Sequence, residues 1–266
     1  MTGESFLSDR VAVVTGAGRG LGQAVAVKLA EHGAAVAIVA RTSAQVDETA
    51  CRIKAAGGRA VGFSADVANV DAVEHLRDEV RRDLGPVTIL VNAAGVFGPI
   101  QSIAESDCAR WIETIHINTI GPYLTCRAFL PDMLALDWGR IINFSSAASL
   151  HAPGPLSSAY GTSKVALNQF TRHLAAELAG TNVTANVIHP GEVKTQMWAA
   201  IRTESQQSGP IGEGYRRWAA DVAASGGDPP HKAAELVLKI VRQTDARWSG
   251  KFLWIDDGKQ TPIPSW

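Results

Sequence analysis

Val11-Ala-Val-Val-Thr-Gly-Ala-Gly-Arg-Gly-Leu-Gly22 joins a short β-branched run to a turn with four glycines, after which a helical pattern begins. Glycines in such a turn let the backbone approach a pyrophosphate at the amino end of the helix. A glycine-rich turn alone is weak evidence, because many helices begin after glycine. The strand before it and the helix after it are, however, the context that a dinucleotide site requires. The stretch therefore predicts a dinucleotide-binding unit near the start of the chain.

The same alternation of strand and helix continues along the chain. Short apolar runs predict buried strands at 11–14, 35–39, 60–63, 87–91, 140–144 and 183–188, with a further one at 250–255. Longer segments with helical periodicity occupy 20–32, 43–56, 70–84, 106–136 and 159–179. No repeat or low-complexity linker divides the chain. These patterns predict an α/β fold with one domain over residues 1–266. The expected architecture is a Rossmann-type, doubly wound parallel sheet of about seven strands, with helices on both faces.

Composition narrows the class of protein further. Apolar residues make up 46% of the chain, charged residues 19%, and the net charge is −1, which is typical of a soluble globular protein. No basic cluster indicates a nucleic-acid surface, and no apolar run is long enough to cross a bilayer. The three cysteines and seven histidines lack metal-ligand spacing. We therefore expect a cytoplasmic protein with no nucleic-acid partner, no membrane partner and no metal site.

Residues 192–230 interrupt the alternation and are rich in Ser, Gly and Gln. Long irregular insertions in compact domains tend to be lids or binding loops. Met197, Trp198 and Trp218 favour a substrate lid over an apolar ligand, and a disordered surface loop is the alternative.

The end of the second predicted strand, at Val39-Ala-Arg-Thr42, indicates which dinucleotide binds. An acidic residue there accepts a hydrogen bond from the ribose 2′-hydroxyl of NAD, whereas arginine suits the 2′-phosphate of NADP. Here Arg41 occupies the junction and Arg19 lies in the glycine-rich turn. Arg41 as a solvated loop residue is the alternative. Two arginines that converge on one ribose favour NADP(H).

Tyr160-Gly-Thr-Ser-Lys164 places a phenol and an ammonium one helical turn apart. Residues four apart share a face of a helix, so Lys164 can lie beside the hydroxyl of Tyr160. A nearby positive charge favours the phenolate and lowers the pKa of the tyrosine. The pair predicts a general acid–base near neutral pH, and an ordinary Tyr–Lys pair on an amphipathic helix is the alternative.

The motifs in sequence order resemble those of the short-chain dehydrogenase/reductase family. They are Thr15-Gly-x-x-x-Gly-x-Gly22, Asp66-Val67, Asn92-Ala-Ala-Gly95, Asn118, Ser145-Ser146, Tyr160-x-x-x-Lys164 and Pro190-Gly191-x-Val193-x-Thr195. The resemblance covers nearly the whole chain. Any one motif is weakly informative, but the ordered set is specific.

The resemblance implies a role for each matching residue. Tyr160 would exchange the proton, Lys164 would lower its pKa and hold the nicotinamide ribose, Ser146 would bind the substrate oxygen, and Asn118 would hold a relay water. The positions that would contact the cofactor are Gly16, Arg19, Gly20, Leu21, Arg41, Thr42, Asp66, Val67, Asn92, Ala93, Gly95, Tyr160, Lys164, Pro190, Gly191, Val193 and Thr195. Ala93 stands where the family usually has a second Asn. The loop between Ser146 and Tyr160 is one residue longer than usual, so Ser145 remains the alternative to Ser146.

The resulting prediction is an NADP(H)-dependent oxidoreductase, a carbonyl reductase or alcohol dehydrogenase, that transfers hydride between nicotinamide and a carbonyl or secondary alcohol. The alternatives are a dehydratase or epimerase on the same fold and a nucleotide-sensing binding protein. The residues expected to form an apolar substrate pocket are Val96, Phe97, Leu150, His151, Leu156, Met197, Trp198 and Trp218. The arginines at 202, 216 and 217 either bind an acidic group or lie on an exposed helix face.

The resemblance also implies a homodimer or homotetramer that pairs the helices at 106–136 and 159–179. Apolar side chains on these helices are available for the interface, although the core competes for them. They are Trp111, Ile115, Phe129, Phe170 and Leu174.

Overall fold

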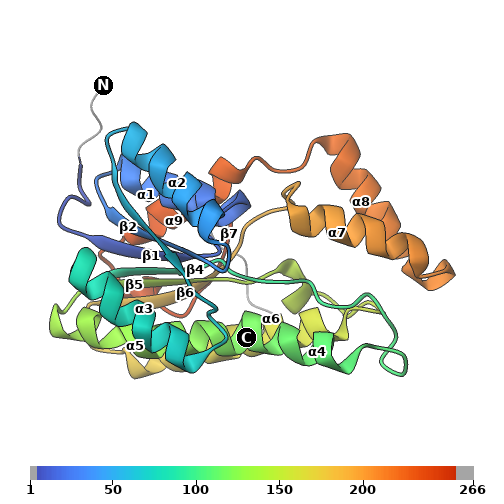
Figure 1. Ribbon diagram of the computed structural model, residues 1–266. Helices are drawn as coiled ribbons and strands as arrows, with labels where there is room; N and C mark the ends of the chain where they lie inside the picture. Colours follow the sequence, from blue (N-terminus) through green and yellow to red (C-terminus); the bar gives the residue numbers. More distant parts are fainter. Residues whose placement is uncertain (1–4, 256–266) are drawn as a thin grey trace.

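A computed structural model describes residues 5–255 and places seven parallel strands in one sheet, in the order β3-β2-β1-β4-β5-β6-β7 (Figure 1). The strands are β1 (Val11–Thr15), β2 (Ala35–Ala40), β3 (Arg59–Ser64), β4 (Ile89–Asn92), β5 (Gly139–Phe144), β6 (Val183–His189) and β7 (Phe252–Trp254). The strand order reverses between β1 and β4, which is the point where doubly wound folds bind ligands. The predicted Rossmann-type fold is confirmed.

Helices cover both faces of this sheet (Figure 1). One layer consists of α1 (Gly20–Glu31), α2 (Ser43–Ala55) and α9 (Pro230–Val241). The opposite layer contains α3 (Val70–Asp83), α4 (Cys108–Ile115), α5 (Gly121–Ala135) and α6 (Ser158–Glu177). Among the helices of residues 5–255, none combines the length and the apolarity that a bilayer crossing requires.

Side-chain alternation along the strands fills both layers. In β1, Ala12 and Val14 pack with α1, α2 and α9, whereas Val11 and Val13 pack with α3, α5 and α6. Successive side chains of a strand point to opposite faces, so a strand buried on both faces is apolar throughout. This explains why the predicted strands appear in the sequence as continuous apolar runs.

The helix predicted at 106–136 is interrupted by a π-helical segment at His116–Ile120. Such a turn holds one residue more than an α-helical turn, and a search for 3.6-residue periodicity does not detect it. It places Asn118, which is buried, between α4 and α5. π turns of this kind occur often at functional sites.

The predicted irregular insertion at 192–230 is instead mainly helical. It contains α7 (Gln196–Glu204) and α8 (Glu213–Ser225), which project beyond the sheet in Figure 1. Thr195 caps the first of these helices, because its Oγ1 accepts a hydrogen bond from the Trp198 amide. Gly209-Pro210 lies between these two helices and Gly226-Gly227 follows the second, so neither pair interrupts a helix.

Two of the side chains expected at a subunit interface belong to the core. Phe129 and Leu174 are buried among residues of β4, β5 and α3. Exposed apolar side chains on the same group of helices are Ile112, Tyr123 and Val165. The sequence pattern does not separate these two sets, because it does not show which apolar side chains of a helix the sheet covers.

A buried polar network joins β4, β5, α5 and α6 beneath the carboxyl edge of the sheet. The Asn92 side-chain amide donates to Asn143 Oδ1 at 2.9 Å, and the Asn143 amide donates to Thr171 Oγ1 at 2.9 Å. Thr125 Oγ1 donates to Asn92 Oδ1 at 2.8 Å. Each of these polar groups is thereby paired, as burial requires.

Replacing Asn143 with Ala is expected to lower the free energy of unfolding by about 2–4 kcal/mol, because Asn92 and Thr171 each lose a buried partner. Urea denaturation measures this change. Asn182→Ala makes the same change at an exposed position, where the side chain bonds Asp137, and should cost less than about 1 kcal/mol. Equal losses in the two variants would contradict the importance given to the buried network.

Candidate active site

A cavity of about 490 Å³ lies over the carboxyl ends of β1, β2, β3 and β4. Its lining includes much of the predicted cofactor set, and residues distant in sequence converge there. The predicted positions that line it are Gly16, Arg19, Gly20, Leu21, Arg41, Thr42, Asp66, Val67, Ala93, Gly95 and Thr195.

The glycine-rich turn at one end of this cavity fits a dinucleotide pyrophosphate. Gly16 has a φ of 65°, and a Cβ there would lie 2.8 Å from the backbone of Ala94. A Cβ on Gly22 would lie 2.4 Å from the Gly16 carbonyl oxygen. The helix that follows has Arg19 at its N-cap, and this side chain makes no capping hydrogen bond. The first amides of α1 therefore remain available to an anion.

Arg41 and Arg19 are exposed side chains of the lining of this cavity. One guanidinium nitrogen of Arg41 lies 3.7 Å from Glu113 Oε1 of α4. The Arg41 carbonyl accepts a hydrogen bond from the Ser64 hydroxyl, which fixes the backbone at this junction. Residues 40–42 contain no carboxylate to receive a ribose hydroxyl.

A second cavity, of about 480 Å³, adjoins the first and shares Leu21, Thr195 and Met197 with it. It lies beneath α7 and α8. Tyr160 and Ser146 are part of its lining, and so are the predicted residues Pro190, Gly191 and Val193. The two cavities thus place the predicted proton-exchanging residues next to the carboxamide end of the predicted cofactor site.

Tyr160 is buried in the first turn of α6, with its ring stacked on Phe97 at 4.6 Å between centroids. Burial raises the pKa of Tyr160, and a hydrogen bond with Ser146 opposes that rise. The net direction is opposite to the lowering that the Tyr–Lys spacing predicts. Removal of the phenolate from water outweighs the attraction that the sequence argument considered.

Lys164 is also buried, and its ammonium donates a 2.8 Å hydrogen bond to the Phe144 carbonyl at the end of β5. Burial lowers the pKa of Lys164 to about 8. Its Nζ lies 5.6 Å from the centroid of the Tyr160 ring, on the same side of α6. The ammonium of Lys164 is therefore bonded to the sheet and lies beside the Tyr160 ring at the same time.

Asn118 joins the π turn to the loop after β4 and to α6. Its Oδ1 accepts from the Val96 amide at 2.9 Å, and its Nδ2 donates to the Val96 carbonyl and to Ser163 Oγ. A Cβ on Gly95 would lie 3.2 Å from Asn118 Oδ1 and 3.7 Å from Lys164 Nζ. Glycine at 95 leaves the passage between these two groups free.

The two adjacent serines have different surroundings. Ser145 is buried, and its hydroxyl donates to Asn168 Oδ1 at 2.5 Å. Ser146 follows it and hydrogen bonds Tyr160, while its Oγ also accepts from the Ala148 amide at 3.2 Å. Of the two hydroxyls, that of Ser146 therefore lies beside the phenol.

Several residues expected at the site lie elsewhere. Asn92 is buried in the polar network beneath the cavities, so its side chain does not line them. Leu150 packs against Val187 and Phe252, and Leu156 packs against Ile100 and Ile201. Both leucines support the walls of the substrate cavity from behind, because their long side chains fill the core.

Other lining residues were not predicted from the sequence. Tyr215 lines the second cavity from α8, beside the predicted Trp218, and His189 and Glu192 line it from the end of β6 and the loop after it. Tyr215 and Trp218 are three residues apart and therefore share one face of α8. Had 213–225 been predicted as a helix, this spacing would have indicated that both residues line the cavity. No motif in the sequence indicates that His189 or Glu192 lines the cavity. They do so because they lie at and just after the end of β6.

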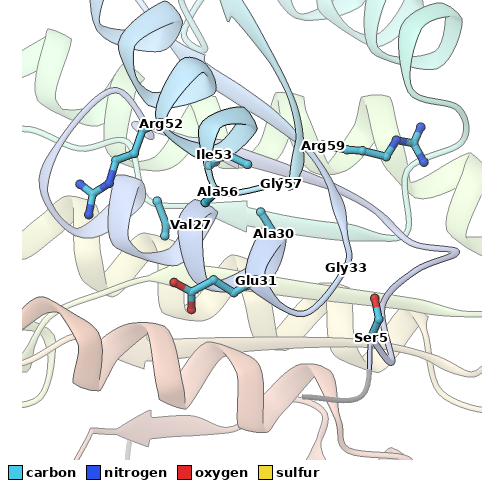
Figure 2. Close-up of a pocket in the computed structure, with 11 residues that line it drawn as sticks. Ser5, Val27, Ala30, Glu31, Gly33, Arg52, Ile53, Ala56, Gly57 and Arg59 are labelled. Atoms are coloured by element: carbon cyan, nitrogen blue, oxygen red, sulfur yellow. The ribbon is translucent and has the colours of Figure 1, made fainter. Parts of the chain in front are cut away.

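A further hollow of about 530 Å³ lies between α1 and α2, at the amino ends of β2 and β3. Figure 2 shows Glu31 and Arg52 at its sides, with Ser5 at its edge. Its charged side chains are exposed, and it lies at the opposite edge of the sheet from the motifs. We therefore assign the candidate active site to the two cavities at the carboxyl edge of the sheet. In residues 5–255, no three His, Cys, Asp or Glu side chains gather as a metal site.

A Rossmann-type sheet with a glycine-rich turn at its switch point is typical of dinucleotide-binding proteins. The chain belongs to the short chain dehydrogenase family, whose sequence model matches residues 10–206. It is 36% identical to the short-chain reductase protein NovJ of Streptomyces niveus over 253 residues, with 94% of each protein covered.

Solved structures of two relatives carry different nicotinamide cofactors. Superposition on a variant of actinorhodin polyketide ketoreductase with NADPH gives a TM-score of 0.83 at 30% identity, covering 92% of this chain and 95% of the other. Superposition on NAD⁺-bound xylitol dehydrogenase gives 0.85 at 26% identity, covering 94% and 98%. The family therefore establishes a nicotinamide-dependent oxidoreductase without fixing which of the two cofactors this chain prefers.

Replacing Lys164 with Met is expected to stabilise the cofactor-free protein by roughly 1–3 kcal/mol at pH 7, because no ammonium must then be buried. The folded-state pKa of about 8 lies below the ordinary value of 10.5. Between these values the unfolded chain binds more protons, so the stability of the wild-type protein rises with pH. The advantage of the variant should therefore shrink from pH 7 to pH 10 in urea denaturation.

Lys194→Met is the matched control, because Lys194 also donates to a carbonyl, that of Ala223, but is exposed. It should change stability by less than about 1 kcal/mol across this pH range. A Lys164→Met variant that is less stable than the wild type at pH 7 would show that the bond to Phe144 outweighs the cost of burial.

Proposed function

We propose that the protein is an NADP(H)-dependent oxidoreductase that transfers hydride between nicotinamide and a carbonyl or secondary alcohol, with Tyr160 as the general acid–base. One observation carries this proposal. The hydroxyls of Tyr160 and Ser146 lie beside each other in a cavity that joins the dinucleotide cavity at Leu21, Thr195 and Met197.

The preference for NADP(H) rests on charge at the adenosine end of the first cavity. Arg41 and Arg19 line that end, and residues 40–42 include no carboxylate. A guanidinium binds a phosphate with two parallel hydrogen bonds, whereas it offers no acceptor to a ribose hydroxyl. The NADPH bound by the actinorhodin ketoreductase relative is consistent with this choice.

The nicotinamide supplies or accepts the hydride when it is bound. Ser146 donates a hydrogen bond to the substrate oxygen and orients it toward the Tyr160 hydroxyl. In reduction the Tyr160 hydroxyl gives its proton to that oxygen as negative charge develops there, and in oxidation it takes the proton back. The raised pKa of Tyr160 keeps the phenol protonated at neutral pH, which suits the reductive direction.

Lys164 and Asn118 support the proton transfer from Tyr160 in two ways. The buried ammonium lies beside the Tyr160 ring and stabilises the phenolate that remains after proton transfer. Asn118 holds the loop at Val96 through two hydrogen bonds, next to Gly95 and the ammonium. This open position at Gly95 suits a water that returns a proton to Tyr160.

The segment 192–230 serves as the lid of the substrate cavity in this proposal. Met197, Trp198 and Trp218 line the cavity from the helices of this segment. Glu204 ties α7 to the loop after β4, since it accepts from the Ile100 amide and pairs with Arg110. Water is thereby excluded from the place where charge develops.

Tyr160→Phe is expected to lower kcat for carbonyl reduction by about 10³-fold, which is within the range for loss of a general acid. The Kd for NADPH, measured by fluorescence titration, should change by less than about threefold, because only one hydroxyl is removed. Tyr123→Phe makes the same change on an exposed face of α5 and should leave both values unaltered. Near wild-type turnover in Tyr160→Phe would refute the assigned role.

Arg41→Ala is expected to raise the Kd for NADPH about tenfold or more and to leave the Kd for NADH within about twofold, because a charge-assisted bond to the 2′-phosphate is lost. The selective effect should weaken as salt is added. Arg59→Ala removes an equally exposed charge at the other edge of the sheet and controls for net charge. Equal losses for NADPH and NADH in Arg41→Ala would contradict the proposed preference.

A further inference from the structure

Five aromatic side chains, those of Phe97, Tyr160, Trp198, Tyr215 and Trp218, line the substrate cavity. Phe97 stacks on Tyr160, and the edge of Tyr215 meets the Phe97 ring at 5.8 Å between centroids and 80° between planes. Trp198 and Trp218 line the same cavity from α7 and α8. Such a surface makes favourable contacts with flat aromatic or alicyclic rings.

The charges around this cavity are unequal. Its lining includes one carboxylate, Glu192, and among the described residues it includes no lysine or arginine. Two arginines of the lid lie outside the lining and make contacts of their own. Arg202 lies 5.5 Å from the centroid of the Trp198 ring, and Arg216 donates to the Ser205 carbonyl at 2.8 Å. These contacts favour the interpretation of the lid arginines as surface groups.

Glu192 is held in place from two directions. Its amide donates to Asp228 Oδ2 at 3.0 Å, and its carbonyl accepts from the Asp228 amide at 2.9 Å. Its Oε1 accepts from the indole nitrogen of Trp218 at 2.8 Å. A flexible surface glutamate could turn away from an approaching anion, but this one is fixed to the wall of the cavity.

We propose that the substrate is an uncharged aromatic or alicyclic carbonyl compound, or its alcohol, and that Glu192 excludes substrates with a carboxylate on the ring. This inference rests on the proposed hydride transfer and names its substrate class. A second carboxylate near Glu192 meets like-charge repulsion in a cavity with no lysine or arginine in its described lining to offset it. Selectivity by repulsion adds to the attraction of the aromatic surface.

The test compares two probes of equal size, 4-acetylbenzamide and 4-acetylbenzoate, with the wild-type enzyme and NADPH. The amide should have a kcat/KM about tenfold above that of the carboxylate, because repulsion between two nearby carboxylates is worth about one power of ten. Glu192→Gln should reduce the ratio to about threefold or less, chiefly through a lower KM for the carboxylate. Glu213→Gln, on the exposed start of α8, should keep the wild-type ratio.

Binding provides a readout that is independent of turnover. Quenching of tryptophan fluorescence gives the Kd of each probe, because Trp198 and Trp218 line the cavity. Trp218→Phe removes the indole donor but keeps the carboxylate, so it should retain the preference for the amide. A similar Kd for both probes in the wild type would overturn the inference, and so would an unchanged ratio in a folded Glu192→Gln variant.

These outcomes are distinguishable from failure of the proposed function. If the wild type binds the amide better than the carboxylate but reduces neither probe with NADPH or NADH, the inference about the cavity stands and the proposed hydride transfer falls. If both probes are reduced equally well, the hydride transfer stands and the role of Glu192 falls.

Discussion

The rest of the site depends on one buried ammonium, that of Lys164, held against the Phe144 carbonyl at the end of β5. Burying this charge is unfavourable, as the fall of its pKa to about 8 indicates. The hydrogen bond fixes α6 relative to the sheet and, with it, Tyr160 one turn earlier. Gly95 lies between this ammonium and Asn118, where a Cβ would approach Asn118 Oδ1 to 3.2 Å, and Asn118 in turn holds the loop at Val96.

The sheet places this group next to a nucleotide. Because the strand order reverses between β1 and β4, the loops after these strands diverge and leave space between them. The Ala94 amide donates to Thr15 Oγ1 across that point, which joins the two loops. The dinucleotide cavity is lined by both of these loops, and the Tyr160 cavity adjoins it, with Leu21, Thr195 and Met197 common to both. In the proposed reaction, proton transfer and hydride transfer therefore take place where the two cavities join.

Much of this arrangement could be predicted from the sequence because it depends on local chemistry. Apolar runs predicted the strands. Glycines predicted the turn after β1, where the structure leaves no room for a Cβ at Gly16 or Gly22. What could not be predicted depends on contacts between distant segments. The π turn around Asn118, the inward direction of Asn92 and the burial of Phe129 are set by neighbouring elements. The pKa of Tyr160 was predicted in the wrong direction because spacing reports a nearby charge but not the loss of water. Residues 192–230 were predicted to be irregular because their glycine content is typical of loops, although these glycines lie mostly outside α7 and α8.

In the proposed reaction, hydride and proton reach one carbonyl group at the place where the two cavities join. The most direct test is reduction of a neutral aromatic ketone with NADPH that carries deuterium at C4 of the nicotinamide, tried with each C4 diastereomer. The account predicts that one diastereomer places one deuterium on the carbinol carbon for each NADP⁺ formed, and that the hydroxyl proton comes from solvent through Tyr160. Conversion of substrate with no deuterium in the product and no net oxidation of NADPH would contradict it and would favour a dehydratase or epimerase.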